Sequence, residues 1–180
     1  MKKLCIILPV AMIICFMVGC QDKEAMAELE AFRAQAALVE QNKELARKWL
    51  EAWNKGDFET FTELLAPDFV LYYPSRSTKP ISQEETLEIG KMLQKAFPDI
   101  KWSMEELIAT EDKTIIRVIE RGTHEGEFMG IPATGNKYEM SAIWISRIEK
   151  GKIVEQREDF DMLGLYQQLG MELKPKEEEK

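Results

Sequence analysis

The sequence predicts an α+β domain in which helices cover one face of a curved antiparallel sheet. Apolar residues of the N-terminal half recur at three- and four-residue steps, which is the helical period. After Pro98 they alternate with polar residues, which is the period of a strand. Helices that precede a run of strands are typical of α+β domains. The chain has 180 residues, enough for one domain with its own core.

Three helices are expected before the main run of strands. The longest spans about residues 23–55, where apolar side chains keep the helical period. Asp57 can cap a short second helix, which ends before Pro67. Ser82, with Glu85 three residues later, forms a capping box for a third helix.

The strands are predicted from alternation and from turn-like segments. A brief strand near residues 68–75 precedes the third helix. Four further strands are expected at residues 101–110, 114–122, 137–148 and 152–160, separated in part by the turn-like segments TEDKT and EKGK. The segment MLGLYQQLG, residues 162–170, predicts one closing helical turn or two.

The N-terminus has the pattern of a secretory signal. A charged start precedes an apolar run from Leu4 to Val18, which is short for a transmembrane helix. The segment that ends at Cys20, MVGC, resembles a bacterial lipobox, in which the cysteine is acylated. The predicted protein is therefore an extracytoplasmic lipoprotein, held at the membrane by a lipid on Cys20, in the periplasm or on the surface of a bacterium. An ordinary signal with an incidental cysteine is the alternative.

This interpretation divides the chain into four parts. Residues 1–19 are the expected signal peptide, and residues 20–40 are a lipid-anchored stalk. Residues 41–171 form the folded domain, and residues 172–180 are a charged tail too polar to pack.

The composition excludes several kinds of chemistry. Cys5, Cys15 and Cys20 are the three cysteines, so the domain after them has no thiol for a disulfide, a zinc site or a nucleophile. His124 is the single histidine, which excludes zinc sites built from two or three histidines. The chain has 24 basic and 32 acidic side chains and a net charge of −8, which argues against nucleic-acid binding. No metal site is expected.

Two aspartates near the end of the last predicted strand are candidates for acid–base chemistry. Alternation places Arg157, Asp159 and Asp161 on one side of that strand. If this side faces a cavity between sheet and helices, unequal surroundings would make one carboxyl group an acid and the other a base. In the alternative, Asp159 pairs with Arg157 at a sheet edge and Asp161 caps the closing helix.

Four segments occur in an order that resembles the SnoaL-like polyketide cyclases, also called ester cyclases. They are AFPDIKW, GTHEGEFMGIPATGNKY, SRIEKGKIVE and DFDMLGLYQQLG, and the similarity extends over about residues 45–170. The resemblance implies the cone-shaped fold of the nuclear-transport-factor-2-like (cystatin-like) superfamily. It also implies that Asp161 is the general acid–base of an aldol closure without metal or organic cofactor, and that Asp159 tunes it. The implied ligand is a small, partly apolar carbonyl compound in the central cavity.

The chain departs from the family pattern at several positions. Relatives often carry histidine where this sequence has Tyr72, Trp144 and Gln156. Tyr72 and Trp144 could stack on a flat ligand, and ordinary packing is the alternative. His124 lies between two glycine-containing segments, either as a catalytic group or as an exposed loop residue.

The sequence leaves open the roles of two arginines and the choice between two functions. Arg157 and Arg147 are candidates for ligand binding, and an ion pair with Glu149 or Glu155 is the alternative for Arg147. The retained Asp161 favours an enzyme, whereas the missing histidines favour a lipoprotein that binds a small ligand without turnover. A homodimer is compatible with either function, because the resemblance implies a sheet of a kind that commonly pairs face to face.

Overall fold

The structure is a computed structural model that describes residues 4–172 and 174, with side chains from residue 23 onward. It contains two compact units, residues 1–39 and residues 40–180. Helix α1 (Leu4–Lys55) begins in the first unit and ends in the second. Within the described residues, no helix combines the length and the hydropathy needed to cross a membrane.

The shorter helices of the second unit begin at the caps expected from the sequence. They are α2 (Phe58–Leu64), α3 (Gln83–Ala96) and α4 (Met162–Gln168). Gly56 adopts a φ of 61° directly after α1, a conformation that favours glycine at a helix end. The side chain of Asp57 caps α2, and Ser82 and Glu85 make both hydrogen bonds of the predicted capping box. The predictions for these helix starts are confirmed.

The strands form one six-stranded sheet in the order β2-β1-β6-β5-β4-β3. Their bounds are β1 (Leu65–Tyr72), β2 (Ile81–Ser82), β3 (Lys101–Ala109), β4 (Lys113–Thr123), β5 (Lys137–Glu149) and β6 (Lys152–Phe160). The pairings are antiparallel except that β1 and β6 run parallel. The parallel pair departs from the expected antiparallel sheet: α3 and four strands separate β1 from β6 along the chain, so no hairpin constrains their direction.

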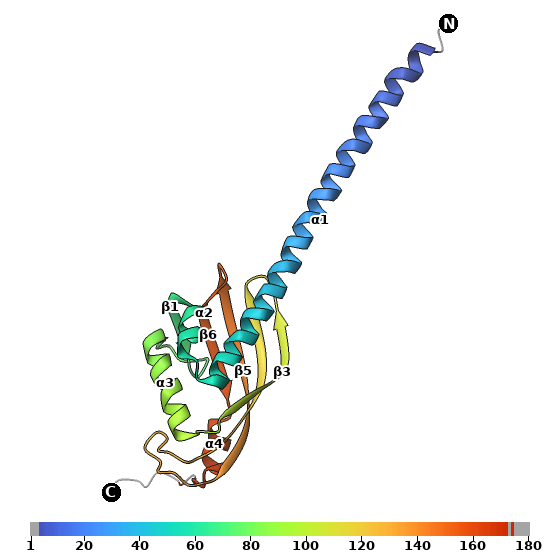
Figure 1. The fold of residues 1–180 in the computed structure, drawn as a ribbon. Coiled ribbons are helices and arrows are strands. Elements are labelled where there is room, and N and C mark those ends of the chain that lie inside the picture. The colour runs from blue at the N-terminus through green and yellow to red at the C-terminus, as the bar shows by residue number, and fades with distance from the viewer. Residues whose placement is uncertain (1–3, 173, 175–180) are drawn as a thin grey trace. The chain divides into compact units, whose positions relative to one another are not determined.

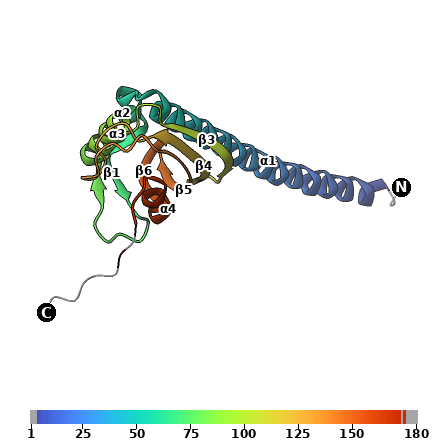
Figure 2. The ribbon, with the colours of Figure 1, turned by 90° about the horizontal axis from the view of Figure 1, so that it is seen from below.

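The predicted α+β class and the curved sheet are confirmed. Within the second unit, α2 and α3 lie on the same side of the sheet as the end of α1 (Figure 1). Seen along the strands, the sheet is an arc whose concave side faces these helices (Figure 2). Buried aromatic side chains fill the space between the layers, with Trp49 stacked on Phe61 at 4.3 Å between ring centroids.

One polar side chain fastens α1 to the edge of the sheet. Asn54 Nδ2 donates to the carbonyl of Trp102, and the amide of Trp102 donates to Asn54 Oδ1, each at 2.9 Å. The side-chain amide thus makes the two hydrogen bonds that a neighbouring strand would make. As a result the rings of Trp53 and Trp102 lie side by side, 5.6 Å apart between centroids.

Candidate functional site

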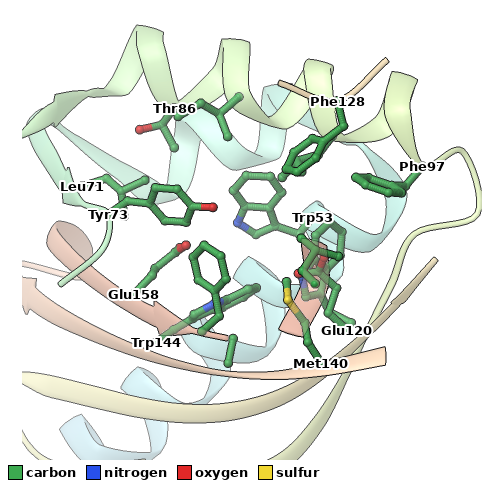
Figure 3. A pocket seen from close by; sticks show the side chains of 16 residues that line it. Trp53, Leu71, Tyr73, Thr86, Phe97, Glu120, Phe128, Met140, Trp144 and Glu158 are labelled. Atoms are coloured by element: carbon green, nitrogen blue, oxygen red, sulfur yellow. The ribbon is translucent and has the colours of Figure 1, made fainter. Parts of the chain in front are cut away.

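A cavity lies between the helices and the concave face of the sheet (Figure 3). Its empty space is about 640 Å³, a volume that includes the open solvent at its mouth. Side chains of α1 and α3 line one side, and side chains of β3, β4, β5 and β6 line the other. Seven aromatic rings contribute: Trp53, Tyr73, Phe97, Trp102, Phe128, Trp144 and Phe160. Such a lining suits a flat, partly apolar ligand.

Two carboxyl groups border this cavity, Glu120 on β4 and Glu158 on β6. Among the described residues that line it, none is a lysine, an arginine or a histidine. A ligand carboxylate would therefore meet like charge without a compensating cation. The cavity favours ligands without a negative charge.

Glu120 is buried and fully hydrogen-bonded. Its Oε2 accepts from Trp102 Nε1 at 2.7 Å, and its Oε1 accepts from the Tyr138 hydroxyl at 2.5 Å. Burial raises the pKa of Glu120, and the hydrogen bonds from Tyr138 and Trp102 oppose that rise. Because both oxygens already have donors, Glu120 is held in place and is poorly suited to take up a proton from a ligand.

Glu158 accepts one side-chain hydrogen bond, whereas Glu120 accepts two. It lies opposite Trp144 across the β5–β6 pair. Its Oε1 accepts from Gln156 Nε2 at 2.5 Å. Burial raises the pKa of Glu158 to about 7; the charge of Glu120 adds to the rise, and the Gln156 hydrogen bond opposes it. A carboxyl group with this pKa is present in both forms at neutral pH, so it can accept and return a proton.

A β-bulge decides which side chains of β6 reach the cavity. Lys150 and Gly151, with φ of 51° and 73°, form the hairpin turn, and Ile148 pairs with Ile153. The pairing then shifts by one residue, so that Arg147 pairs with Glu155. From this point on, Gln156, Glu158 and Phe160 form the inward side of β6: Gln156 is buried, and the other two line the cavity.

The two predicted aspartates lie outside the cavity. Asp159 is exposed and accepts hydrogen bonds from the Ser75 hydroxyl at 2.5 Å and the Ser75 amide at 3.3 Å. Asp161 is exposed and caps α4, where its Oδ1 accepts from the amide of Gly164 at 2.8 Å. This cap is the alternative that the sequence left open for Asp161. For Asp159 the partner is Ser75 rather than Arg157.

His124 is buried but does not line the cavity. Its ring lies beside Phe97 at 5.3 Å between centroids, and Nδ1 is 3.1 Å from the Thr134 hydroxyl. The sequence offered an exposed loop histidine as the alternative to a catalytic one. The structure instead packs this histidine under the loop that Thr134 belongs to.

The remaining predicted ligand-binding residues separate into two groups. Trp144 lines the cavity, as its prediction required. Arg157 lies over the ring of Tyr72, 4.1 Å from the centroid, and donates to Glu155 at 2.8 Å. Arg147 forms an ion pair with Glu149, the alternative given for it. Neither arginine is among the lining residues, nor is Tyr72.

Two predictions cannot be placed at this site. The backbone of Cys20 belongs to α1, but its side chain lies outside the described residues, as do residues 173 and 175–180 of the predicted tail. Within the described part of the chain, no three His, Cys, Asp or Glu side chains come together to hold a metal ion.

The sequence analysis considered the last strand, β6, but missed the carboxyl group of Glu158, which faces the cavity. Glu158, Glu120 and Trp53 were not singled out from the sequence. The alternation of Gln156, Glu158 and Phe160 was a signal for the inward side, but strict counting from the turn hides it. Counted without the bulge, Arg157 rather than Glu158 falls opposite Trp144.

Comparisons with known proteins agree with this fold. The chain is 28% identical over 130 residues to the aklanonic acid methyl ester cyclase DauD of Streptomyces sp. (strain C5), covering 71% of this chain and 80% of that protein. The crystal structure of IdmH from Streptomyces antibioticus is 34% identical, with a TM-score of 0.64 over 72% of this chain and 98% of that one. AclR from Streptomyces galilaeus is 30% identical, with a TM-score of 0.67 over 73% and 97%.

The family model described as SnoaL-like polyketide cyclase matches residues 43–169, well over half of the chain. This matched segment contains each side chain that lines the cavity. The chain therefore belongs to the SnoaL-like polyketide cyclase family.

Proposed function

We propose that the chain is an enzyme that acts on a small, partly apolar carbonyl compound by cofactor-independent acid–base catalysis, with Glu158 as the proton-transferring group. One observation carries the proposal: a carboxyl group with a pKa of about 7 borders an aromatic-lined cavity. General bases work best when their pKa is close to the operating pH. Strongly shifted carboxyl groups in cavities are candidates for this role.

The proposed reaction is an intramolecular aldol closure. Glu158 takes a proton from the carbon next to a carbonyl group. The electron pair of the broken carbon–hydrogen bond is shared with that carbonyl group, which forms an enolate. The enolate carbon bonds to a second carbonyl carbon of the same molecule, whose oxygen becomes an alkoxide. Protonated Glu158 returns its proton to that alkoxide, so the product is an isomer of the substrate. The walls of the cavity would hold the two reacting carbons close together.

The charge of the lining supports a neutral substrate. With Glu120 and Glu158 in the cavity and no basic side chain among its described lining residues, an ester is favoured over the corresponding free acid. The relative DauD, an aklanonic acid methyl ester cyclase, is named for a methyl ester. By analogy, the proposed substrate of the present chain is a neutral carbonyl compound.

Asp161 is the alternative proton-transferring group, since the family resemblance implies that it is the general acid–base. Its exposed position at the cap of α4 favours Glu158 instead. A second candidate function is ligand binding without turnover. The seven aromatic rings of the cavity support it, because they would hold a flat ligand whether or not a proton is transferred.

The proposal is tested with a bicyclic β-keto ester, methyl 1-tetralone-2-carboxylate, in D₂O. The full chain should exchange the proton between the two carbonyl groups faster than buffer alone, as followed by ¹H NMR. Glu158→Gln should lower the enzyme-dependent rate by at least about 100-fold, because proton transfer typically contributes that much. Asp161→Asn should leave the rate unchanged. If the wild-type chain exchanges no faster than buffer but binds the ester, the non-catalytic function is the better account.

The lipoprotein assignment is also a proposal, and it rests on the apolar run from Leu4 to Val18 and on Cys20. In a bacterial host, the wild-type chain should fractionate with membranes and incorporate labelled fatty acid. Cys20→Ala should remove the label, while Cys15→Ala should keep it. A wild-type chain that carries no label would contradict the proposal.

The outer face of the sheet supports the proposal of a homodimer. Ile108, Ile115 and Ile145 are paired across β3, β4 and β5, and each is between 38% and 49% exposed. Ile143 adds to this stripe with 45% exposure. A stripe of this kind, on the face opposite the cavity, matches the surface that two copies would cover in a face-to-face pair.

A further inference from the structure

Three buried nitrogen atoms have no hydrogen-bond partner among the described residues. They are the indole nitrogens of Trp49 and Trp53 and Nε2 of His124. Buried polar groups without a partner are uncommon, because the lost hydrogen bond to water is not replaced. Trp49 and His124 do not line the cavity, whereas Trp53 is one of its lining residues. The unsatisfied donor of Trp53 is therefore the one that a ligand in the cavity could satisfy.

Packing fixes the ring of Trp53. Trp49 and Phe61 meet it edge to face, at 5.9 Å and 5.0 Å between centroids. On α3, Gly90 lies so close that a Cβ there would be 3.0 Å from the Trp53 ring. The ring has little room to turn its N–H toward another partner. Figure 3 shows the indole nitrogen of Trp53 turned toward the part of the cavity that Tyr73 and Glu158 border.

Tyr73 supplies a second donor at the same place. Its ring stacks on Phe160 at 4.6 Å between centroids, and its hydroxyl points toward Trp53 (Figure 3). Burial, with the charges of Glu158 and Glu120, raises the pKa of Tyr73. The hydroxyl therefore keeps its proton at neutral pH and can donate it in a hydrogen bond.

We propose that the indole N–H of Trp53 and the hydroxyl of Tyr73 together bind the carbonyl oxygen of the ligand and hold the negative charge that forms on it. The proposal rests on the proposed function, because it assigns the partner groups of Glu158. When Glu158 takes the proton from carbon, its own negative charge disappears and one appears on the ligand oxygen. The net charge of the cavity stays the same, and two neutral donors fix where the charge resides.

This arrangement also specifies the chemical class of the ligand. The carbonyl oxygen must lie within reach of Trp53 on α1 and of Tyr73, which follows β1, while the acidic carbon faces Glu158 on β6. The matching compound is a neutral, flat, enolisable ketone or ester. A ligand whose oxygen is anionic before reaction would bind poorly, because Glu120 and Glu158 repel it.

The test uses two probes and measures binding by calorimetry, without turnover. Methyl 1-hydroxy-2-naphthoate mimics the enol form of the β-keto ester, and naphthalene has the same two rings without oxygen. Trp53→Phe and Tyr73→Phe should each weaken binding of the hydroxy ester about five- to tenfold, the effect of one lost hydrogen bond. Both variants should bind naphthalene as the wild type does.

Trp49→Phe is the matched control, because it removes an unpaired indole N–H from a residue that does not line the cavity and keeps an aromatic ring beside Trp53. It should leave both affinities unchanged, and circular dichroism checks that all variants are folded. The proposal is overturned if the wild type does not bind the hydroxy ester. It is also overturned if Tyr73→Phe, which removes one oxygen atom, has no effect and Trp53→Phe weakens both probes equally.

The two experiments distinguish a failure of the donor pair from a failure of the proposed catalytic function. If Glu158→Gln abolishes proton exchange while Trp53→Phe and Tyr73→Phe bind the hydroxy ester normally, the donor pair is wrong and the base stands. If the hydroxy ester depends on both donors and no exchange occurs, the donor pair stands as a ligand-binding site and the catalytic function fails.

Discussion

Glu158 and Trp144 lie directly opposite each other in the β5–β6 pair, on the side of the sheet that borders the cavity. Side chains that face each other across an antiparallel pair point to the same side. The carboxyl group is thereby placed beside an indole ring rather than in bulk water. This relationship depends on the extra residue that the β-bulge inserts between the turn and Glu158.

The pH dependence of proton exchange should report Glu158. With a pKa of about 7, the carboxyl group is mostly protonated and inactive as a base at pH 6, and mostly ionised at pH 8. The enzyme-dependent exchange rate should therefore rise about tenfold through this range and level off above it. The measurement is the ¹H NMR exchange rate of the β-keto ester at each pH, with the buffer rate subtracted. A midpoint near pH 4 would indicate an exposed carboxylate and contradict the role of Glu158.

The fold could be predicted from the sequence because its signals are local. Capping residues such as Ser82 and Asp57 act within three positions, and alternation marks the strands without reference to the rest of the chain. The resemblance to a known family agreed with these signals. The parallel pairing of β1 and β6 is not local, since 79 residues lie between the end of β1 at Tyr72 and the start of β6 at Lys152, and it was missed.

The site was harder to predict because one inserted residue reverses the facing of a strand. Counting from the hairpin turn places Asp159 and Asp161 on a common side but does not say that the bulge precedes them. The buried Glu120 was missed for a different reason. Its burial depends on donors from Trp102 and Tyr138, which come from different strands and meet only in the folded protein.

The stability of Glu158→Gln should exceed that of the wild type above pH 7. The folded-state pKa of about 7 is above the unfolded value of about 4.5, so the folded state binds more protons between these pH values. The unfolding free energy of the wild type therefore falls as pH rises through this window and is constant above it. The variant lacks this loss, which is up to about 3 kcal/mol.

Urea unfolding at pH 5 and pH 8 measures this difference. Glutamine keeps an oxygen that can accept from Gln156, so the hydrogen bond need not be lost with the charge. Glu155→Gln is the control on the same strand. The difference in unfolding free energy between Glu158→Gln and the wild type should be larger at pH 8 than at pH 5. An equal difference at both pH values would show that Glu158 is not buried in its charged form.

Substitutions of Asp161 should affect the stability of α4 and leave proton exchange alone. Asp161→Ala removes the cap and should lower the unfolding free energy by about 1 kcal/mol. Asp161→Asn keeps an oxygen for the Gly164 amide and should be close to the wild type. Gly164→Ala should act like Asp161→Ala, because its Cβ would lie 2.2 Å from Asp161 Oδ2.

Thermal unfolding and the exchange assay should be made on the same samples of these variants. If Asp161→Ala and Gly164→Ala are less stable but keep the wild-type exchange rate per folded molecule, Asp161 acts only as the cap of α4. A loss of exchange in the stable Asp161→Asn variant would restore Asp161 as the acid–base group and remove that role from Glu158.

A charge in the outer stripe should separate the proposed dimer. Ile145 lies at the centre of the stripe, paired with Ile115 on β4, and it is 39% exposed. In a face-to-face pair, Ile145→Glu would bury a carboxylate from each copy in the interface, which is costly. Light scattering should show a dimer for the wild-type chain and a monomer for Ile145→Glu, with detergent present for any lipid anchor. Leu163→Glu, an equally exposed position on α4, should remain dimeric, and a monomeric wild type would contradict the proposal.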